Sequence, residues 1–344
     1  MSPVPRLRRA LLISLAALSL LAAAPEPATV HPALGLDVNL PAGTPAAEQR
    51  RALDLARQTG ASLYALNLSW SAAEPQPRQY RVADLIRTAR LLRQSGAILH
   101  LDLPLVAGRA RDVPADLAGI AFDDSRLSLR LGRLLDALEP ALRDISTLSL
   151  GYEADAYFAD KPDELRAYRR LFDGAVQFLG RKAPRLKVGV TTSAPTESPA
   201  PTVAAALHQR SPVLFYIYAP FESSKPFFQR GPDSIEKDWR AILDAAPNRP
   251  IAFPEVSYSS AEENGGTPDK QADFVRRMRR LVAGADGRRI LFARWVSWRD
   301  TAPDGKAATD LERRRDAFFA HRGLQTPDGA AKPAWRAWVR AAGP

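Results

Sequence analysis

LSLGYEAD, at residues 148–155, is a short apolar run with strand character that ends in a glutamate followed by a loop. IAFPEVSY, at residues 251–258, repeats this form later in the chain. Around both stretches, short apolar runs alternate with segments whose apolar residues recur at helical spacing. A regular alternation of strands and helices predicts a parallel sheet. The two glutamates, Glu153 and Glu255, are then expected at the same edge of that sheet.

Eight strand–helix units are predicted after residue 33. The strands are expected at 34–40, 62–70, 97–105, 145–153, 186–193, 212–219, 250–257 and 289–298. The helices are expected at 45–58, 82–94, 127–142, 162–179, 201–209, 232–246, 268–283 and 310–321, with a last short helix at 333–339. Eight such units in 344 residues predict an α/β fold of the (β/α)8, or TIM, barrel type. A doubly wound open sheet is the alternative, but no glycine-rich phosphate loop opens the first helix.

The composition is that of a soluble globular protein, with 46% hydrophobic and 25% charged residues. The formal net charge is +10, and arginines spread over the helices supply most of it. The densest pairs, Arg276-Arg277 and Arg279-Arg280, have no interleaved aromatic residue. We therefore expect a solvated helix face and no nucleic-acid partner. The charge remains compatible with an acidic substrate or an anionic surface.

Cysteine is absent, which removes disulfides, thiol nucleophiles and the lipid-modified cysteine of a bacterial lipoprotein. The four histidines, His31, His100, His208 and His321, do not have the spacing of metal ligands. We expect neither a metal nor a cofactor.

The N-terminus has the features of a signal peptide at residues 1–24. Three arginines at positions 6, 8 and 9 precede an apolar run that is too short to span a bilayer, and small residues at 22–24 offer a cleavage site. A linker at 25–33 and one barrel domain at 34–344 are expected to follow. We expect a secreted or periplasmic monomer without stable membrane insertion after cleavage; an uncleaved membrane anchor is the alternative.

Side chains of a barrel strand alternate between the interior and the helix layer. On the fourth strand this parity groups Gly151 and Glu153 with the small polar residues Thr147 and Ser149, and Tyr152 with the leucines. The same parity allows polar residues of the other strands to converge on one mouth, where barrel active sites lie. The residues expected there are Asp37, Asn39, Asn67, His100, Asp102, Thr191, Tyr216, Tyr218 and Glu255.

Three further stretches are to be read with the two glutamates: WSAAEPQPRQY at 70–80, RWVSW at 294–298, and the segment from Gly323 to Trp335. Together with the two glutamates they resemble the clan-A retaining glycoside hydrolases, a superfamily that includes endo-galactanases and cellulases. The resemblance spans the whole mature chain. It implies a (β/α)8 fold, Glu153 as the acid/base and Glu255 as the nucleophile. The two carboxyl groups of a retaining enzyme are expected about 5 to 5.5 Å apart.

The resemblance also implies substrate contacts. Trp70, Trp295 and Trp298 are expected to offer flat faces to sugar rings. Tyr216 or Tyr218 is expected to hydrogen-bond Glu255, as a tyrosine of strand six does in this clan. Further substrate contacts are expected from Asp37, Asn67, His100, Asp102, Tyr152 and Asp155. Packing is the alternative for the tryptophans, interior hydrogen bonding for His100 and Asp102, and a loop role for Asp155. Glu74 is expected to hold its loop.

One position departs from the clan pattern. Tyr152 stands before Glu153, where the family has an asparagine whose amide contacts the sugar's 2-hydroxyl. Two functions follow as expectations. The first is a retaining hydrolase of a polysaccharide or exopolysaccharide. The second is a catalytically inactive, carbohydrate-binding barrel in a polysaccharide assembly or export system.

Overall fold

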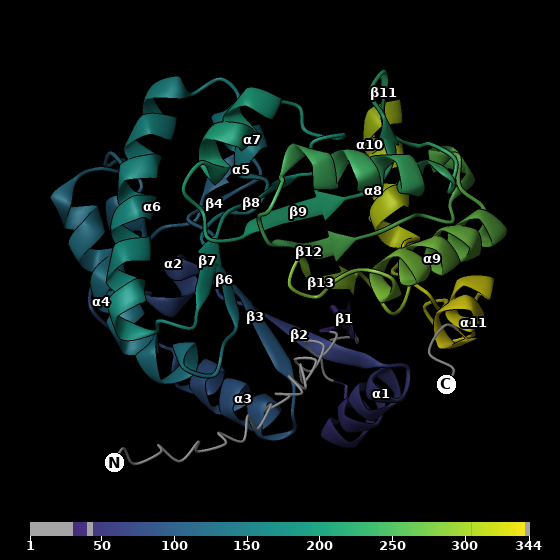
Figure 1. Ribbon diagram of the computed structural model, residues 1–344, viewed down its shortest axis with the longest axis horizontal. Coiled ribbons are helices and arrows are strands. Elements are labelled where there is room, and N and C mark those ends of the chain that lie inside the picture. The colour runs from purple at the N-terminus through teal and green to yellow at the C-terminus, as the bar shows by residue number, and fades with distance from the viewer. Residues whose placement is uncertain (1–29, 40–43, 304, 341–344) are drawn as a thin grey trace, which may run out of the picture.

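Parallel strands form the centre of the structure, a computed structural model that describes residues 30–39, 44–303 and 305–340. Nine strands of this part of the chain pair in parallel in one sheet, and helices surround it (Figure 1). Their order is β7 (Lys187–Gly189), β6 (Thr147–Ser149), β3 (Ile98–Asp102), β2 (Ala61–Asn67), β1 (Ala33–Leu36), β13 (Ile290–Trp295), β12 (Ile251–Val256), β9 (Leu214–Tyr218) and β8 (Thr191–Ser193).

The sheet closes on itself within one predicted strand. The strands at its two ends, β7 and β8, are separated in sequence only by Val190. They are therefore two pieces of the predicted fifth strand, one paired with β6 and the other with β9. The predicted eight-unit α/β barrel is confirmed.

Every predicted helix is present with nearly the expected bounds. They are α1 (Ala46–Gln58), α3 (Ala83–Gln94), α4 (Ser125–Leu142), α6 (Pro162–Lys182), α7 (Pro201–His208), α8 (Ser234–Ala245), α9 (Pro268–Ala283), α10 (Asp310–Ala320) and α11 (Pro333–Arg340). Local signals explain several of their starts. Asp124 caps α4, Thr267 caps α9 just before a proline, and Thr309 forms a capping box with Glu312 at α10.

A small apolar cluster fills the lower barrel interior. Leu63, Phe215, Ala252 and Phe292 belong to it although they come from four different strands, so their side chains point inward. Two larger clusters lie between the sheet and the helices. The interior cluster and the two outer clusters together show which side chains of each strand point into the barrel and which point toward the helices.

Short elements after the strands were not predicted. They are the helices α2 (Trp70–Ala73) and α5 (Ala154–Phe158), the 3-10 turns η1 (Ala115–Leu117) and η2 (Glu262–Asn264), and two hairpins, β4 (Val106–Ala107) with β5 (Ala110–Arg111) and β10 (Phe221–Glu222) with β11 (Lys225–Gln229). Segments of two to five residues are too short to show a period. They build the rim of the mouth.

The predicted signal peptide and most of the linker lie outside the described residues. Within the described ranges, no helix combines the length and apolar character that crossing a bilayer requires.

Candidate active site

Both predicted glutamates lie where strands end. Glu255 belongs to β12, and its Cα is paired with Ile217 on β9. Glu153 follows β6 after an irregular stretch and is the N-cap of α5. Its φ of 48° is in the left-handed region, which non-glycine residues rarely adopt and which is enriched at functional sites.

The alternation of β12 is broken just before Glu255. Ala252 belongs to the interior cluster, whereas Phe253 stacks on Trp239 of α8 in the helix layer. The register of β12 against β9 then shifts between Ala252 and Glu255. Such a bulge re-aims the next side chain, and here it directs Glu255 into the mouth.

The fourth strand breaks its alternation as well, which corrects the predicted parity. A Cβ at Gly151 would lie 3.0 Å from the hydroxyl of Tyr168 on α6, so this residue faces the helix layer and not the interior. Tyr152 consequently turns into the barrel, opposite to the expectation. Regular alternation predicts Tyr152 on the outer face, together with Leu148 and Leu150.

Two side chains hold the Glu255 carboxylate. The Tyr152 hydroxyl donates to Oε2 at 2.5 Å, and Arg322 Nη1 donates to Oε1 at 2.6 Å. Burial and the neighbouring Glu255 charge raise the pKa of Tyr152 well above its usual value, so the phenol stays a proton donor. The two hydrogen bonds reach both carboxylate oxygens and so fix the orientation of the Glu255 side chain.

Glu153 has the opposite electrostatic environment. Burial, and then the charges of Glu255 and Asp155, raise the pKa of Glu153 from 4.5 to about 7, although Arg322 acts against the shift. Gly108, in the turn between β4 and β5, lies against it, since a Cβ there would be 3.4 Å from Glu153 Oε2. A protonated carboxyl beside an ionised one is the arrangement that acid-assisted displacement requires.

His100 and Asp102 lie inside the barrel as predicted, and they bond to each other and to the strands. His100 is fully buried, with Nδ1 2.9 Å from Thr147 Oγ1 and Nε2 3.1 Å from Asp102 Oδ1. Burial acts to raise the pKa of Asp102, but His100 and Arg294 hold it below its usual value. These contacts match the alternative reading of interior hydrogen bonding. The hydroxyl oxygens of Ser149 and Thr191 also form a hydrogen bond inside the barrel, 2.8 Å apart.

Two predicted contact residues remain open to solvent. Asn67 is exposed at the end of β2, in register with Asp102. Asp37 follows β1, is half-exposed, and lies 3.6 Å from the Arg294 guanidinium. The side chain of the neighbouring Asn39 is already hydrogen-bonded within the protein. Its amide nitrogen donates to the Arg299 carbonyl, and its amide oxygen accepts from the Arg299 backbone N–H.

Tyr216 and Tyr218 do not reach the mouth, contrary to prediction. Tyr216 packs against His208 of α7, and the Tyr218 hydroxyl donates to Asp238 of α8 at 2.6 Å. On β9 the side chains that point into the barrel are those of Phe215 and of the residues two positions away from it. The hydrogen bond to Glu255 that was expected from strand six comes instead from Tyr152.

The three tryptophans are also placed differently from the expectation. Trp70 and Trp295 are 0% exposed, and Trp298 is 3% exposed, so no ring face is free for a sugar. Trp70 donates to Glu74, which also binds Arg130 and the Arg78 backbone and so holds the loop as predicted. Trp298 stacks on Trp335 of α11.

Asp155 is likewise structural. It is fully buried, and its carboxylate accepts from the Ser193 backbone and from the Ser198 hydroxyl, which ties α5 to the loop after β8. Its charge also acts on Glu153, whose pKa it helps to raise.

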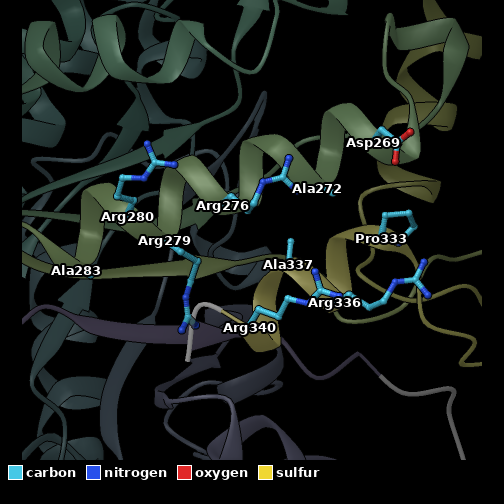
Figure 2. Close-up of a pocket in the computed structure, with 10 residues that line it drawn as sticks. All are labelled: Asp269, Ala272, Arg276, Arg279, Arg280, Ala283, Pro333, Arg336, Ala337 and Arg340. Atoms are coloured by element: carbon cyan, nitrogen blue, oxygen red, sulfur yellow. The ribbon is translucent and has the colours of Figure 1, made fainter. Parts of the chain in front are cut away.

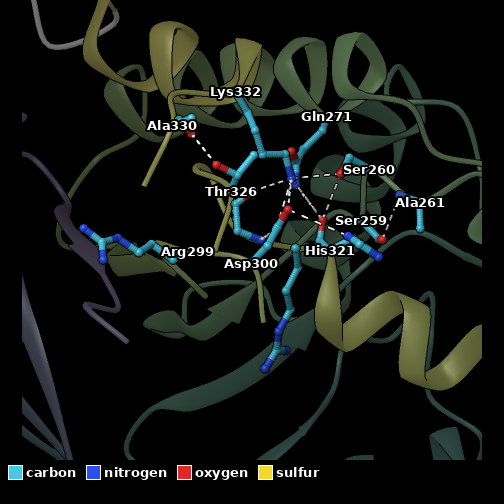
Figure 3. Close-up of polar contacts among 12 residues, drawn as sticks. Ser259, Ser260, Ala261, Gln271, Arg299, Asp300, His321, Thr326, Ala330 and Lys332 are labelled. Atoms are coloured by element: carbon cyan, nitrogen blue, oxygen red, sulfur yellow. Dashed lines mark hydrogen bonds and ion pairs between the residues drawn. The ribbon is translucent and has the colours of Figure 1, made fainter. Parts of the chain in front are cut away.

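Arg322 is a site residue that the sequence does not predict. The loop that carries it is held by a polar network around Lys332 and Asp300 (Figure 3). Trp295 donates to the Arg322 carbonyl at 3.2 Å. Beside it, Lys332 binds both oxygens of Asp300 and the Gly323 carbonyl, while Asp300 accepts from the Gly323 amide. The Lys332–Asp300 pair is almost completely buried and therefore holds the backbone next to Arg322.

We expect Lys332→Met to lower the free energy of unfolding by about 3–5 kcal/mol, because it removes the lysine counter-ion of the buried Asp300 carboxylate. Urea denaturation measures the change. Lys182→Met is the matched control, since it removes solvent-exposed ion pairs with Asp136 and Glu139 and should cost less than about 1 kcal/mol. Equal losses in the two variants would contradict the structural role of Lys332.

Comparison with known proteins places this geometry in context. The sequence matches no protein-family model and no curated protein. Solved structures do match. A GH5_18 variant from Streptomyces cattleya in complex with Manb1-4GlcNAc superposes with a TM-score of 0.67, at 16% identity, over 91% of this chain and 80% of that one. The chain therefore shares the (β/α)8 fold of this glycoside hydrolase.

Other glycoside hydrolases with this fold are similarly distant in sequence. A GH5_18 from Bifidobacterium longum subsp. infantis aligns with a TM-score of 0.62 at 16% identity, over 91% of this chain and 79% of that one. The exo-beta-1,4-mannosidase Op5Man5 from Opitutaceae bacterium strain TAV5 aligns with a TM-score of 0.65 at 17% identity, over 91% and 59% respectively. At such identities the likeness concerns the fold.

Proposed function

We propose that the protein is a retaining glycoside hydrolase that cleaves O-glycosidic bonds of a polysaccharide or exopolysaccharide. The observation that carries the proposal is the pair of glutamates in contrasting environments at the barrel mouth. Glu153 has a pKa of about 7, whereas the Glu255 carboxylate accepts hydrogen bonds from Tyr152 and Arg322. The shared fold with glycoside hydrolases supports the same reading.

In the proposed reaction, the Glu255 carboxylate attacks the anomeric carbon while the Glu153 carboxyl gives its proton to the leaving oxygen. The glycosidic C–O bond breaks, and a covalent glycosyl ester forms on Glu255. Glu153, now ionised, takes a proton from water, which attacks the same carbon and releases the sugar. Asn67 and Asp37, open at the strand ends, are proposed to contact the substrate.

Tyr152 is proposed to position Glu255 from the place where the clan has an asparagine. We expect Tyr152→Phe to lower kcat by about tenfold to a hundredfold, because a hydrogen bond to a charged group is lost. KM should change little, because the lost hydrogen bond is made to Glu255 and not to the substrate. Tyr216→Phe is the matched control and should retain wild-type kinetics, since this tyrosine lies in the helix layer. An unchanged kcat in Tyr152→Phe, or an equal loss in Tyr216→Phe, would contradict the positioning role.

The second candidate is a carbohydrate-binding barrel without turnover, part of a polysaccharide assembly or export system. One observation favours it: no asparagine amide precedes Glu153 to contact a sugar 2-hydroxyl. A protein with this function would still bind saccharide at the barrel mouth, but its two glutamates would not catalyse hydrolysis.

Hydrolysis of a panel of aryl β-glycosides and bacterial or plant polysaccharides separates the two candidates. Turnover with the product released first as the same anomer, followed by NMR, supports the retaining hydrolase. Release of the opposite anomer would contradict retention. Saccharide binding without turnover on any substrate would favour the binding protein.

We also propose the location and the domain organisation. A signal peptide at 1–24 would export the protein to the periplasm or the exterior, where an extracellular glycan is accessible. Residues 34–344 would then form one catalytic domain, which we propose to be monomeric. Measuring the N-terminal mass of the exported protein tests the cleavage site.

A further inference from the structure

A cavity of about 590 Å³ lies in the helix layer between α9 and α11, outside the barrel mouth (Figure 2). Each helix contributes one stripe of residues to it. We call it the arginine groove, and its lining is Asp269, Ala272, Arg276, Arg279, Arg280, Ala283, Pro333, Arg336, Ala337 and Arg340. Five arginines thus face a single carboxylate across small side chains.

Most of this positive charge is uncompensated. Arg276 pairs with Asp273 at 3.1 Å. Arg280, Arg336 and Arg340 are exposed, and none of them forms an ion pair with any residue that the structure describes. On a protein of net charge +10, unpaired arginines on two adjacent helices repel one another unless an anion lies between them.

Arg279 is the unusual member of the set. Its side chain is 5% exposed, and its contacts are the Thr59 carbonyl at 3.2 Å and the Trp338 ring at 4.7 Å. No carboxylate of the described residues pairs with it, and burial lowers its pKa to about 10. A buried guanidinium without a counter-ion is costly, and an acidic ligand in the groove would reduce that cost.

We propose that the arginine groove binds a carboxylate-bearing glycan, a short uronate-containing segment. Arginine forks match carboxylates bidentately, and this favours arginine over lysine in such a site. Arg276 with Arg280, and Arg336 with Arg340, are spaced by one helical turn, so each helix presents a row of cations. A chain with one carboxylate per sugar presents a corresponding row of anions. The volume is that of a small-ligand site.

Two other polyanions fit the lining less well. A membrane surface is held by large apolar side chains as well as by basic ones, and the groove has none. Single-stranded nucleic acid is held by aromatic stacking platforms, which are also missing from the lining. A carboxylate-bearing glycan requires only the arginines of the groove and the small side chains that lie between them.

Titration calorimetry with tetragalacturonate, using the full chain at low ionic strength, tests the proposal. The combined variant Arg280→Gln, Arg336→Gln, Arg340→Gln should lose at least about tenfold in affinity. The combined variant Arg90→Gln, Arg133→Gln, Arg181→Gln removes the same charge from exposed positions on other helices and should bind within about twofold of wild type. Thermal unfolding verifies that both variants are folded.

Several results would overturn the proposal. They are absence of binding by wild type, unchanged binding by the groove variant, or an equal loss in the control variant, which would indicate a general charge effect. Equal or tighter binding of inorganic phosphate, single-stranded DNA or phosphatidylglycerol vesicles would assign the groove to those anions. Glu153→Ala and Glu255→Ala should bind tetragalacturonate as wild type does, so this site and the proposed hydrolase activity can fail separately.

Discussion

Glu255→Ala should abolish hydrolysis, with a loss on the order of 10⁴-fold or more in kcat. Glu255 is proposed to form the covalent intermediate, and alanine leaves nothing to attack the anomeric carbon. Its partners Tyr152 and Arg322 would remain in place and leave a space the size of a carboxylate. A small anion such as azide can enter that space and attack in its stead.

The measurement is turnover of an aryl glycoside with and without azide, together with NMR of the product. We expect azide to restore turnover and to give a glycosyl azide of inverted configuration. Glu263→Ala removes an exposed carboxylate and should be as active as wild type in the absence of azide. If Glu255→Ala kept more than about a tenth of wild-type activity without azide, Glu255 would not be the nucleophile.

Glu153→Gln should lower activity on substrates with poor leaving groups by about 10²–10⁴-fold, the usual contribution of a general acid. Dinitrophenyl glycosides need no proton on the leaving group, so the first step should survive on them. The basic limb of the wild-type kcat/KM profile should lie near pH 7, because Glu153 must be protonated and its pKa is about 7. In the variant that limb should disappear.

The same substitution should increase stability at alkaline pH. The folded pKa of Glu153 lies above its ordinary value, so the folded state binds more protons than the unfolded state between about pH 4.5 and 7. Wild-type stability therefore falls as the pH rises through this window, by up to about 3 kcal/mol for the shift from 4.5 to about 7. Glutamine carries no such charge.

Urea denaturation of both proteins at pH 5 and pH 8 measures this effect. The stability of Glu153→Gln relative to wild type should grow between the two pH values. A constant difference would show that Glu153 is not buried against neighbouring negative charge. Combined with the kinetic profile, this result would identify the titrating group independently of any substrate.

The fold could be predicted from local patterns. Apolar runs, helical spacing, prolines at helix starts and caps such as Thr309 act within a few residues, so the sequence alone was sufficient to place the strands and helices. The positions of Glu153 and Glu255 at strand ends followed from that register. So did the inward direction of His100 and Asp102, which lie on a strand with regular alternation.

Directions near the mouth were decided by tertiary structure. Every residue of β9 is apolar or aromatic, and a strand buried on both faces has no pattern to separate inside from outside, so Tyr216 and Tyr218 were misplaced. Irregular backbone at Gly151 and between Ala252 and Glu255 reverses parity where the site is built.

The sequence by itself thus determined the barrel, its order of elements and the two carboxylates. Only the tertiary structure decided what surrounds those carboxylates. Tyr152 and Arg322 reach Glu255 across 103 and 67 residues of chain, and a raised pKa at Glu153 depends on burial and on charges brought together by folding. Such contacts leave no local period, because they depend on where distant segments pack and not on spacing along the chain.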